Sequence, residues 1–231
     1  MTTSRVGKHI SQKFSDELEG IKNHLLTMGG IVEQQLEMAS RALIDGDTRL
    51  ADEVIKEGVR VNALEKLIDE ECAQCLARRQ PAATDLRLIV TVIKAVNDLE
   101  RVGDQAEHLA KFAVQLAEHA RPKNNYHEVY QLAHHVTQMF HDALDAFARL
   151  DEEVALNVIK EDKSVGHEYE AIMRQHITYM MDDPRTINSS LDVLWAIRAL
   201  ERVGDHASNI CEYLVYLVKG KDIRHIDQEN T

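Results

Sequence analysis

The sequence predicts an all-α fold: a tandem duplication of an antiparallel three-helix bundle, with six long helices. Three observations lead to this prediction. Apolar residues recur at intervals of three and four along most of the 231-residue chain, which is the period of an α-helix. Proline and glycine, which interrupt helices, number only 3 and 10. The hexamer Leu-Glu-Arg-Val-Gly-Asp occurs twice, at 99–104 and 200–205, and therefore indicates two copies of one unit.

A second repeated sequence, of four residues, shows how the two copies align with each other. Val-Ile-Lys-Glu occurs at 54–57 and 158–161, an offset of 104 residues, whereas the two hexamers are 101 residues apart. The first repeat is therefore three residues longer than the second between its tetrapeptide and its hexamer, most simply in the turns around Pro81 and Pro184. The predicted units are a first repeat at 8–120, a second repeat at 125–219 and a flexible tail at 220–231.

The first repeat contains three predicted helices. The first follows a long apolar row and ends at the break around Gly46, after which Asp47 is the expected N-cap of the second helix. The second helix ends near Gln80, just before a proline. Thr84 can then cap the third helix, which carries the first hexamer.

The second repeat follows the same plan. Arg-Pro-Lys-Asn-Asn at 121–125 forms the linker between the repeats. Asp151 is the expected N-cap of the middle helix, and Gly220 can end the last one. The three helices are expected at about 126–149, 152–181 and 187–218. Helices of this length exceed the globular mean of about 11–12 residues and are typical of bundles, in which short connections make consecutive helices alternate in direction.

The composition excludes several classes of protein. The formal net charge is −12, whereas a nucleic-acid-binding protein needs a basic surface to displace counterions. Three cysteines are too few for a disulfide framework, and we interpret Cys72 and Cys75 as ordinary helix-packing residues rather than a metal or redox site. The N-terminus carries no apolar signal region, and no run of 18 apolar residues occurs. The expected compartment is therefore the cytoplasm.

Each hexamer places two carboxylates on one helical face. Glu100 and Asp104 are four residues apart, as are Glu201 and Asp205, which separates the members of each pair by about 40° around the helix axis. Glu107 continues the line of the first pair. On both helices the row begins with apolar residues and turns acidic, which is unusual for a face that meets only water.

Two interpretations of these rows remain open. Clustered carboxylates repel one another, and burial increases the cost, so a bound cation would stabilise them. Oxygen-rich sites suit Mg²⁺, Ca²⁺, Mn²⁺ or iron. Alternatively, the carboxylates belong to a structural ion-pair network, because Arg101 and Arg202 follow the two glutamates and Arg198 lies within one turn of Glu201.

Other motifs argue against known catalytic sites. No dinucleotide-binding or phosphate-binding glycine motif occurs, so we expect Gly103 and Gly204 of the hexamers to permit close helix crossing. No Glu-x-x-His occurs, which argues against the di-iron carboxylate class. His206 follows Asp205, but its counterpart in the first repeat is Gln105. We therefore expect a surface or supporting position for His206 rather than a ligand role common to both repeats.

Several stretches carry a family resemblance in addition to Glu-Arg-Val-Gly-Asp on the third helix of each repeat. They are Ile-Asp-Glu-Glu-Cys at 68–72, Arg-Arg-Gln-Pro at 78–81, Asp-Leu-Arg at 85–87 and Tyr-Leu-Val-Lys-Gly-Lys-Asp at 216–222. With these stretches the chain resembles the PhoU family of phosphate-transport accessory and regulatory proteins, over roughly residues 8–226.

The resemblance implies two similar three-helix bundles and a protein that is not an enzyme. It implies a cytoplasmic negative regulator of phosphate-starvation signalling, which also restrains phosphate uptake. The implied partners are the ATPase subunit of the phosphate-specific ABC transporter and the sensor histidine kinase of the phosphate two-component system, between which the protein would act as an adaptor. A homodimer is also expected, with no nucleic-acid partner and with membrane association only through these partners.

The resemblance further implies metal binding, because some family members hold multinuclear clusters through pairs of acidic motifs. The pairs on the third helices match. A second pair is expected on each preceding helix, where this chain reads Gly58 and Asn62 in the first repeat and Asp162 and Gly166 in the second. The implied metal ligands are therefore Glu100, Asp104, Glu201, Asp205 and Asp162. They would hold one Mg²⁺ or Mn²⁺ per bundle rather than an iron or zinc cluster, and no organic cofactor is expected.

Two other functions stay open on sequence grounds. One is a helical scaffold, which either binds metal or is purely structural and held by internal ion pairs. The other is a metal-dependent enzyme that handles phosphate esters with two metal ions. Only the carboxylates support the enzyme, because no general base is evident in the sequence.

Overall fold

The computed structural model describes residues 3–117 and 126–223. These residues are almost entirely helical, and none of them lies in a strand. The helices are α1 (Thr3–Asp45), α2 (Thr48–Arg79), α3 (Ala83–Ala117), α4 (His127–Arg149), α5 (Glu152–Asp182) and α6 (Ile187–Lys219), with a 3₁₀-helix η1 (Pro184–Thr186) before α6. The prediction of an all-α fold with six long helices is confirmed.

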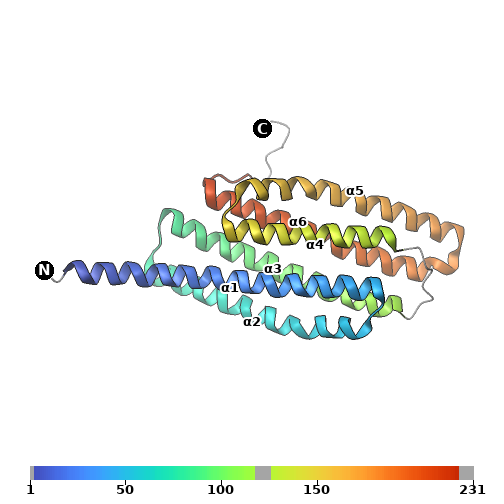
Figure 1. The fold of residues 1–231 in the computed structure, drawn as a ribbon, viewed down its shortest axis with the longest axis horizontal. Helices are drawn as coiled ribbons and strands as arrows, with labels where there is room; N and C mark the ends of the chain where they lie inside the picture. The colour runs from blue at the N-terminus through green and yellow to red at the C-terminus, as the bar shows by residue number, and fades with distance from the viewer. Residues whose placement is uncertain (1–2, 118–125, 224–231) are drawn as a thin grey trace.

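The helices form two antiparallel three-helix units that pack side by side (Figure 1). Consecutive helices reverse direction, so α1–α3 and α4–α6 follow the same course within their units. The α2–α3 turn and the α5–α6 turn lie at opposite ends of the molecule. Between the units, α3 and α6 make the most extensive contact, and these are the two helices that carry the hexamers.

Most helix ends use the local signals that the sequence predicts. The Asp47 carboxylate accepts hydrogen bonds from the backbone N–H groups of Arg49 and Leu50, and Asp151 caps α5 in the same way. Gly220 ends α6 with a φ of 68°, in the left-handed region that glycine adopts without a steric cost. The register of the two repeats is therefore marked by equivalent caps.

The predicted cap of α3 is wrong. α3 begins at Ala83, so Thr84 lies inside its first turn, where the hydroxyl accepts a hydrogen bond from the Arg87 guanidinium at 3.2 Å. The chain turns earlier than expected because Gln80, which ends α2, and Ala83 both adopt left-handed backbone angles, with φ of 49° and 48°. The end of α2 at Gln80 is as predicted.

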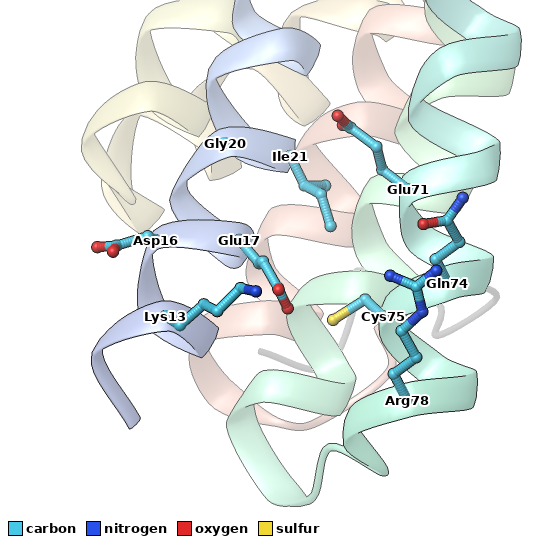
Figure 2. A pocket seen from close by; sticks show the side chains of 9 residues that line it. All are labelled: Lys13, Asp16, Glu17, Gly20, Ile21, Glu71, Gln74, Cys75 and Arg78. Atoms are coloured by element: carbon cyan, nitrogen blue, oxygen red, sulfur yellow. The ribbon is translucent and has the colours of Figure 1, made fainter. Parts of the chain in front are cut away.

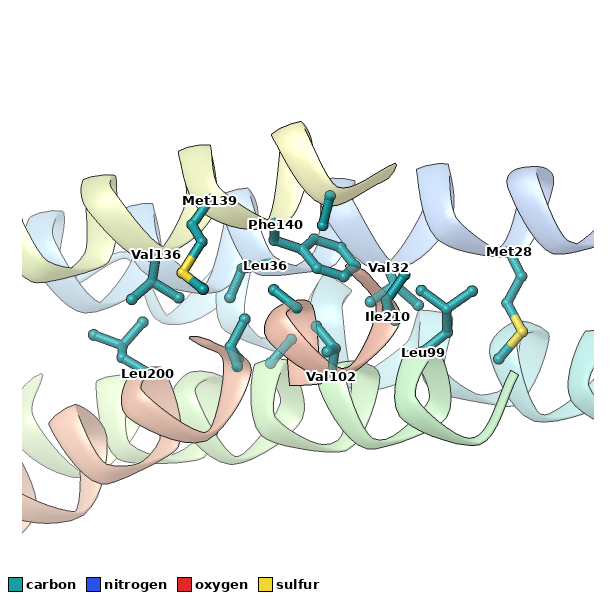
Figure 3. Close-up of a cluster of buried hydrophobic side chains, with 14 of the residues drawn as sticks. Met28, Val32, Leu36, Leu99, Val102, Val136, Met139, Phe140, Leu200 and Ile210 are labelled. Carbon is teal, nitrogen blue, oxygen red and sulfur yellow. The ribbon is translucent and has the colours of Figure 1, made fainter. Parts of the chain in front are cut away.

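The two units share one hydrophobic core. Buried side chains from all six helices belong to a single cluster. Figure 3 shows part of it, where Phe140 of α4 lies near Val32 and Leu36 of α1, with Val102 of α3 and Ile210 of α6 in the same cluster. Phe140 and Leu36 are fully buried and occupy equivalent places in the two repeats, 104 residues apart. Because burial of such a side chain contributes about 1.5–3 kcal/mol, each repeat depends on the other for part of its stability.

Polar contacts also cross between α3 and α6. The Thr91 hydroxyl donates to the Tyr213 carbonyl at 3.4 Å. The Asp98 carboxylate, on a residue that is 7% exposed, lies 2.6 Å from His206 Nδ1 and accepts a hydrogen bond from Asn209 at 3.1 Å. Residue numbers that rise along α3 meet numbers that fall along α6, so the two helices are antiparallel. This buried contact joins the two repeats at one defined point.

The hexamer glycines face the second helix of their units, but the close crossing predicted for both is supported only at Gly204. A Cβ on Gly103 would lie 3.5 Å from a methyl group of Val61, and one on Gly204 would lie 3.3 Å from Val165. A methyl group would therefore fit at position 103, whereas at position 204 it would be slightly crowded. The linker expected at 121–125 and the tail beyond residue 223 lie outside the described residues.

Candidate functional site

The first carboxylate cluster lies on α3. Glu100 is half-buried, with 19% of its side chain exposed, whereas 40% of the Asp104 side chain is exposed. Arg101 lies 3.5 Å from the Glu100 carboxylate and 3.6 Å from that of Asp104. The helix therefore brings the two predicted ligands onto one face, and a single guanidinium contacts both.

The surroundings of Glu100 disfavour its ionised form. Burial raises the pKa of Glu100, and repulsion from the Asp104 carboxylate and, to a smaller extent, from Glu65 of α2 raises it further. Arg101 and His206 act in the opposite direction without cancelling the increase. A carboxylate in this situation is stabilised by any cation that reaches it.

A third carboxylate joins the first cluster. Glu107 follows Asp104 on α3 by less than one turn, and 23% of its side chain is exposed. Its carboxylate fills the space beside Gly58 of α2, so that a methyl group at Gly58 would overlap a Glu107 oxygen. Gly58 is where the family resemblance implies an acidic ligand. Glu107 supplies a carboxylate at that place from the neighbouring helix.

The second cluster combines α5 and α6. Glu201 belongs to α6 and receives two contacts of 2.8 Å from Arg198. Asp162 belongs to α5, and its Oδ1 lies 3.5 Å from where a Cβ on Gly204 would be. No hydrogen bond or ion pair joins Asp162 or Asp205 to another residue that the structure describes. Burial raises the pKa of Asp205, although His206, Arg198 and Arg202 oppose the increase, whereas no cation opposes the raised pKa of Asp162.

Repulsion and burial act on this cluster as well. Burial raises the pKa of Asp162, and the Asp205 carboxylate raises it further. The pKa of Glu201 is raised by burial first and then by Asp205, although Arg198 opposes the shift. The structure therefore brings Asp162, Asp205 and Glu201 near one another, which helical spacing alone predicted only for the last two.

The five predicted ligands fall into two clusters, one in each unit. Arg101 and Arg198 pair with carboxylates, as the ion-pair interpretation expects. Within residues 3–117 and 126–223, no group of three or more His, Cys, Asp or Glu side chains is arranged to hold a metal ion. Metal binding at these carboxylates therefore stays a prediction.

Sequence reasoning placed Glu107 in line with Glu100 and Asp104 but did not predict that its carboxylate lies beside Gly58 of α2. The counterpart of Glu107 in the second repeat, 101 residues later, is Ser208, and the counterpart of Gly58, 104 residues later, is Asp162. The first repeat thus has glycine on its second helix and glutamate on its third, and the second repeat has aspartate and serine. Comparison of the aligned repeats would have identified this difference, because each repeat has one carboxylate at these two positions, on the third helix in the first repeat and on the second helix in the second.

His206 lies between the clusters rather than free at the surface. Only 21% of its side chain is exposed, and its Nδ1 contacts Asp98 across the contact between α3 and α6. Its charge favours the ionised forms of Glu100 in one cluster and Asp205 in the other. His206 is therefore a supporting residue at the boundary of the two repeats.

The cysteines pack in the interior, as predicted. Cys72, Cys75 and Cys211 are buried and form no disulfide. Burial raises the pKa of Cys72 to about 12, so its thiol stays protonated at neutral pH and is a poor nucleophile and metal ligand.

A cavity of about 450 Å³ lies between α1 and α2 near one end of the first unit (Figure 2). Lys13 and Glu17 of α1 line one side, and Glu71 and Arg78 of α2 line the other. α4 begins at the place equivalent to residue 23, so the α1 segment that lines this cavity has no counterpart in α4. The cavity is thus a product of the longer first helix and stands apart from the duplicated carboxylates.

Comparisons with known proteins agree with the duplicated fold. The PhoU domain model matches twice, at residues 25–113 and 129–214, once in each three-helix unit. The chain is 51% identical over 218 residues to a phosphate-specific transport system accessory protein PhoU homolog of Pseudomonas aeruginosa, covering 94% of this chain and 90% of that protein. It is 45% identical over 227 residues to the PhoU accessory protein of Escherichia coli, with 98% and 93% covered.

Solved structures give the same result. The crystal structure of PhoU from Pseudomonas aeruginosa superposes with a TM-score of 0.88 at 50% identity, covering 90% of this chain and all of that chain. The phosphate transport system regulatory protein PhoU from Streptococcus pneumoniae superposes with a TM-score of 0.83 at 30% identity, covering 91% and 99%. With both repeats matched, and with close relatives along almost its whole length, the chain belongs to the PhoU family.

Proposed function

We propose that this protein is a non-enzymatic accessory regulator of phosphate transport. One observation carries the proposal: both repeats match the PhoU domain, and relatives at 45–51% identity over most of the chain are named accessory proteins of the phosphate-specific transport system. The more distant relative of known structure is named a regulatory protein. None of these names describes an enzyme.

The finer proposal concerns partners and place. The protein acts in the cytoplasm as an adaptor between the ATPase subunit of the phosphate-specific ABC transporter and the sensor histidine kinase. When phosphate is abundant, it keeps the starvation response off and restrains uptake. Among the described residues, no helix combines the length and the apolar character needed to cross a bilayer, and we propose that contact with the membrane is made through the partners.

The carboxylate clusters are the proposed docking surface. A strain that lacks the gene, carrying a reporter of the phosphate-starvation response, tests this directly. We expect the wild-type chain to restore repression in high phosphate, and a variant with Lys at Glu100, Asp104, Glu201 and Asp205 to fail. A control with Lys at four exposed carboxylates elsewhere, Glu19, Asp52, Glu53 and Glu153, should repress normally. Full repression by the first variant would mean that these clusters do not contact the partners.

A second proposal is that each cluster binds one divalent cation, Mg²⁺ or Mn²⁺. It is supported by the raised pKa values of Glu100, Glu201 and Asp162 and by the gathering of carboxylate oxygens, which these ions prefer. Elemental analysis of the purified protein and melting curves with added Mg²⁺ or Mn²⁺ test it. We expect Asp205→Asn to abolish most of the cation-induced rise in Tm, and Asp182→Asn, at an exposed residue of α5, to leave it intact.

A metal-dependent phosphate esterase is the remaining alternative. Only the carboxylates support it. We expect no turnover of phosphate esters with Mg²⁺ or Mn²⁺, and a rate that disappears in Asp104→Ala would establish the enzyme instead.

A further inference from the structure

A second cavity, of about 180 Å³, lies at the end of the second unit where α4 begins and α5 turns into α6. Figure 1 shows these helix ends together at one end of the molecule. We call it the end cavity. Its lining combines the start of α4, the last turns of α5 and the first turn of α6, and it includes Tyr126, His176, Tyr179, Asp182 and Ser190.

Two buried side chains in the wall of the end cavity lack hydrogen-bond partners. His176 is 4% exposed, and its Nδ1 has no partner among the residues that the structure describes. Ser190 is 3% exposed, and its hydroxyl likewise makes no hydrogen bond with another described residue. Such groups are rare in folded proteins, because burial removes their hydrogen bonds to water. A ligand that bonds to both side chains would replace what they lose.

The first repeat fills the equivalent places with residues that need no partner. At offsets of 104 and 101 residues, His176 corresponds to Cys72 and Ser190 corresponds to Ile89. Cys72 and Ile89 are fully buried in the core of the first unit. Packing of a three-helix unit therefore does not require a histidine and a serine at these places, which indicates that the pair serves another purpose in the second repeat.

His176 offers a hydrogen-bond acceptor at neutral pH. Burial lowers the pKa of His176, although Glu128 of α4 opposes the shift. The neutral imidazole has one ring nitrogen that donates and one that accepts, and the Ser190 hydroxyl also accepts. The inner wall of the end cavity thus suits a ligand that carries N–H groups.

The mouth of the end cavity is acidic and aromatic. Asp182 is exposed, lines the cavity and forms no hydrogen bond or ion pair with another described residue. The carboxylate of the neighbouring Asp183 is already paired with Arg185, at 2.9 Å. The rings of Tyr126 and Tyr179 also line the cavity, and aromatic ring faces attract cations. The net charge of −12 further raises the local concentration of cations.

An anion fits the end cavity poorly, although α4 and α6 both begin there. The positive end of α4 already has Glu128 in its first turn, and Asp183 caps η1, which leads into α6. Asp182 would repel an anion in addition. In the part of the chain that the structure describes, no three His, Cys, Asp or Glu side chains are arranged to hold a metal ion, which disfavours an inorganic cation.

We propose that the end cavity binds a small organic cation, an aliphatic diamine. At ~30 Å³ for each water-sized group, the volume of about 180 Å³ holds about six non-hydrogen atoms. One ammonium group donates to Asp182 at the mouth, and the other amino group donates to His176 and Ser190 at the inner wall. The alkyl chain between them lies against the tyrosine rings.

Isothermal titration calorimetry of the purified full chain at constant ionic strength tests the proposal, with 1,4-diaminobutane as the probe. We expect saturable binding of one molecule per chain, and much weaker binding of 1,4-butanediol, which has the same size without the charge. Asp182→Asn should weaken binding of the diamine by about tenfold or more, the effect of losing a hydrogen bond to a charged group. Asp52→Asn, at an exposed carboxylate of α2, changes the net charge equally and should bind as tightly as the wild type.

A cavity-filling variant tests the inner wall. Ser190→Ile installs the residue of the first repeat and should abolish binding, with circular dichroism to show that it folds; if it does not fold, Asp182→Asn at the exposed mouth decides. The proposal is overturned if the wild type shows no saturable binding at millimolar diamine, or if Asp182→Asn binds as tightly as Asp52→Asn. Tighter binding of inorganic phosphate, or of Nα-acetyl-lysine amide as a stand-in for a partner's lysine, would also overturn it. Because purified protein is measured, failure of the regulatory function in cells is a separate result.

Discussion

The two repeats use one scaffold and differ in what they place on it. Both have three long helices, an aspartate cap on the second helix and the same hexamer on the third. They differ in where the third carboxylate comes from, Glu107 on α3 in one and Asp162 on α5 in the other, and on the last helix, where Trp195 of the second repeat takes the place of Lys94. The scaffold therefore accommodates a carboxylate from either of two adjacent helices, whereas the aspartate caps of the second helices and the hexamers of the third helices are the same in both repeats.

Removal of the central ring should have the largest effect, because both repeats share the core around it. Phe140→Ala should lower the free energy of unfolding by about 3–5 kcal/mol, and Leu36→Ala, at the equivalent place in the first repeat, by about 2–5 kcal/mol. Chemical denaturation followed by circular dichroism measures both. Each variant should unfold in a single transition. Two separate transitions in either variant would mean that the repeats fold independently, contrary to a shared core.

Exchange of the carboxylate between helices should have the next largest effect. Gly58→Asp places a second carboxylate where that of Glu107 already lies. The end of the flexible Glu107 side chain can move aside, so we expect a destabilisation at the low end of overpacking, about 1–1.5 kcal/mol, with like-charge repulsion as its main cause. Glu107→Ser in the same chain should restore most of the loss, because the first repeat then has the pattern of the second. Urea unfolding of the single and double variants measures the coupling. Equal stability of Gly58→Asp with and without Glu107→Ser would contradict the proposed exchange.

The helix caps should have smaller and equal effects. Asp47→Ala and Asp151→Ala each remove a carboxylate that accepts two backbone N–H hydrogen bonds, and each should cost about 1 kcal/mol. Thermal melts of the two variants, with Thr84→Ala as a control that removes no cap, test this equivalence. A much larger effect at one cap would show that the two repeats are not equivalent at this position.

The pH dependence of the second cluster should be the smallest effect. Because the pKa of Asp162 is raised in the folded protein, folding favours its protonated form, and stability falls as pH rises from the ordinary aspartate pKa through the raised value. Without divalent cations, Asp162→Asn should therefore have a slightly higher Tm than the wild type at pH 7, and the difference should vanish near pH 3. Melting curves between pH 3 and 8 measure it. A lower Tm for Asp162→Asn at pH 7 would show that a cation or an ion pair stabilises the carboxylate.

The sequence by itself determined the helices, most of their ends and their duplication. These features follow from local signals. Apolar residues at the helical period indicate a helix, aspartate marks its start and glycine its end, and the repeated tetrapeptide and hexamer indicate the duplication. The pairs Glu100 with Asp104 and Glu201 with Asp205 were predictable for the same reason, since residues four positions apart on one helix lie on the same face. The error at Thr84 arose where two residues with left-handed backbone angles tightened a turn, which no local cap signal indicates.

Only the tertiary structure decided which groups from different helices meet. The place beside Gly58 is filled from α3 because two helices cross closely there, and the contact of Asp98 with His206 exists because α3 and α6 pack antiparallel. The exposure of Met181 and Trp195, at 79% and 59%, is likewise a property of the packed molecule, since the sequence has apolar residues at helical spacing on buried and open faces alike. Helical periodicity depends on neighbours along one chain segment, whereas these features depend on the relative placement of segments about 50 to more than 100 residues apart, as closely packed helices fix it.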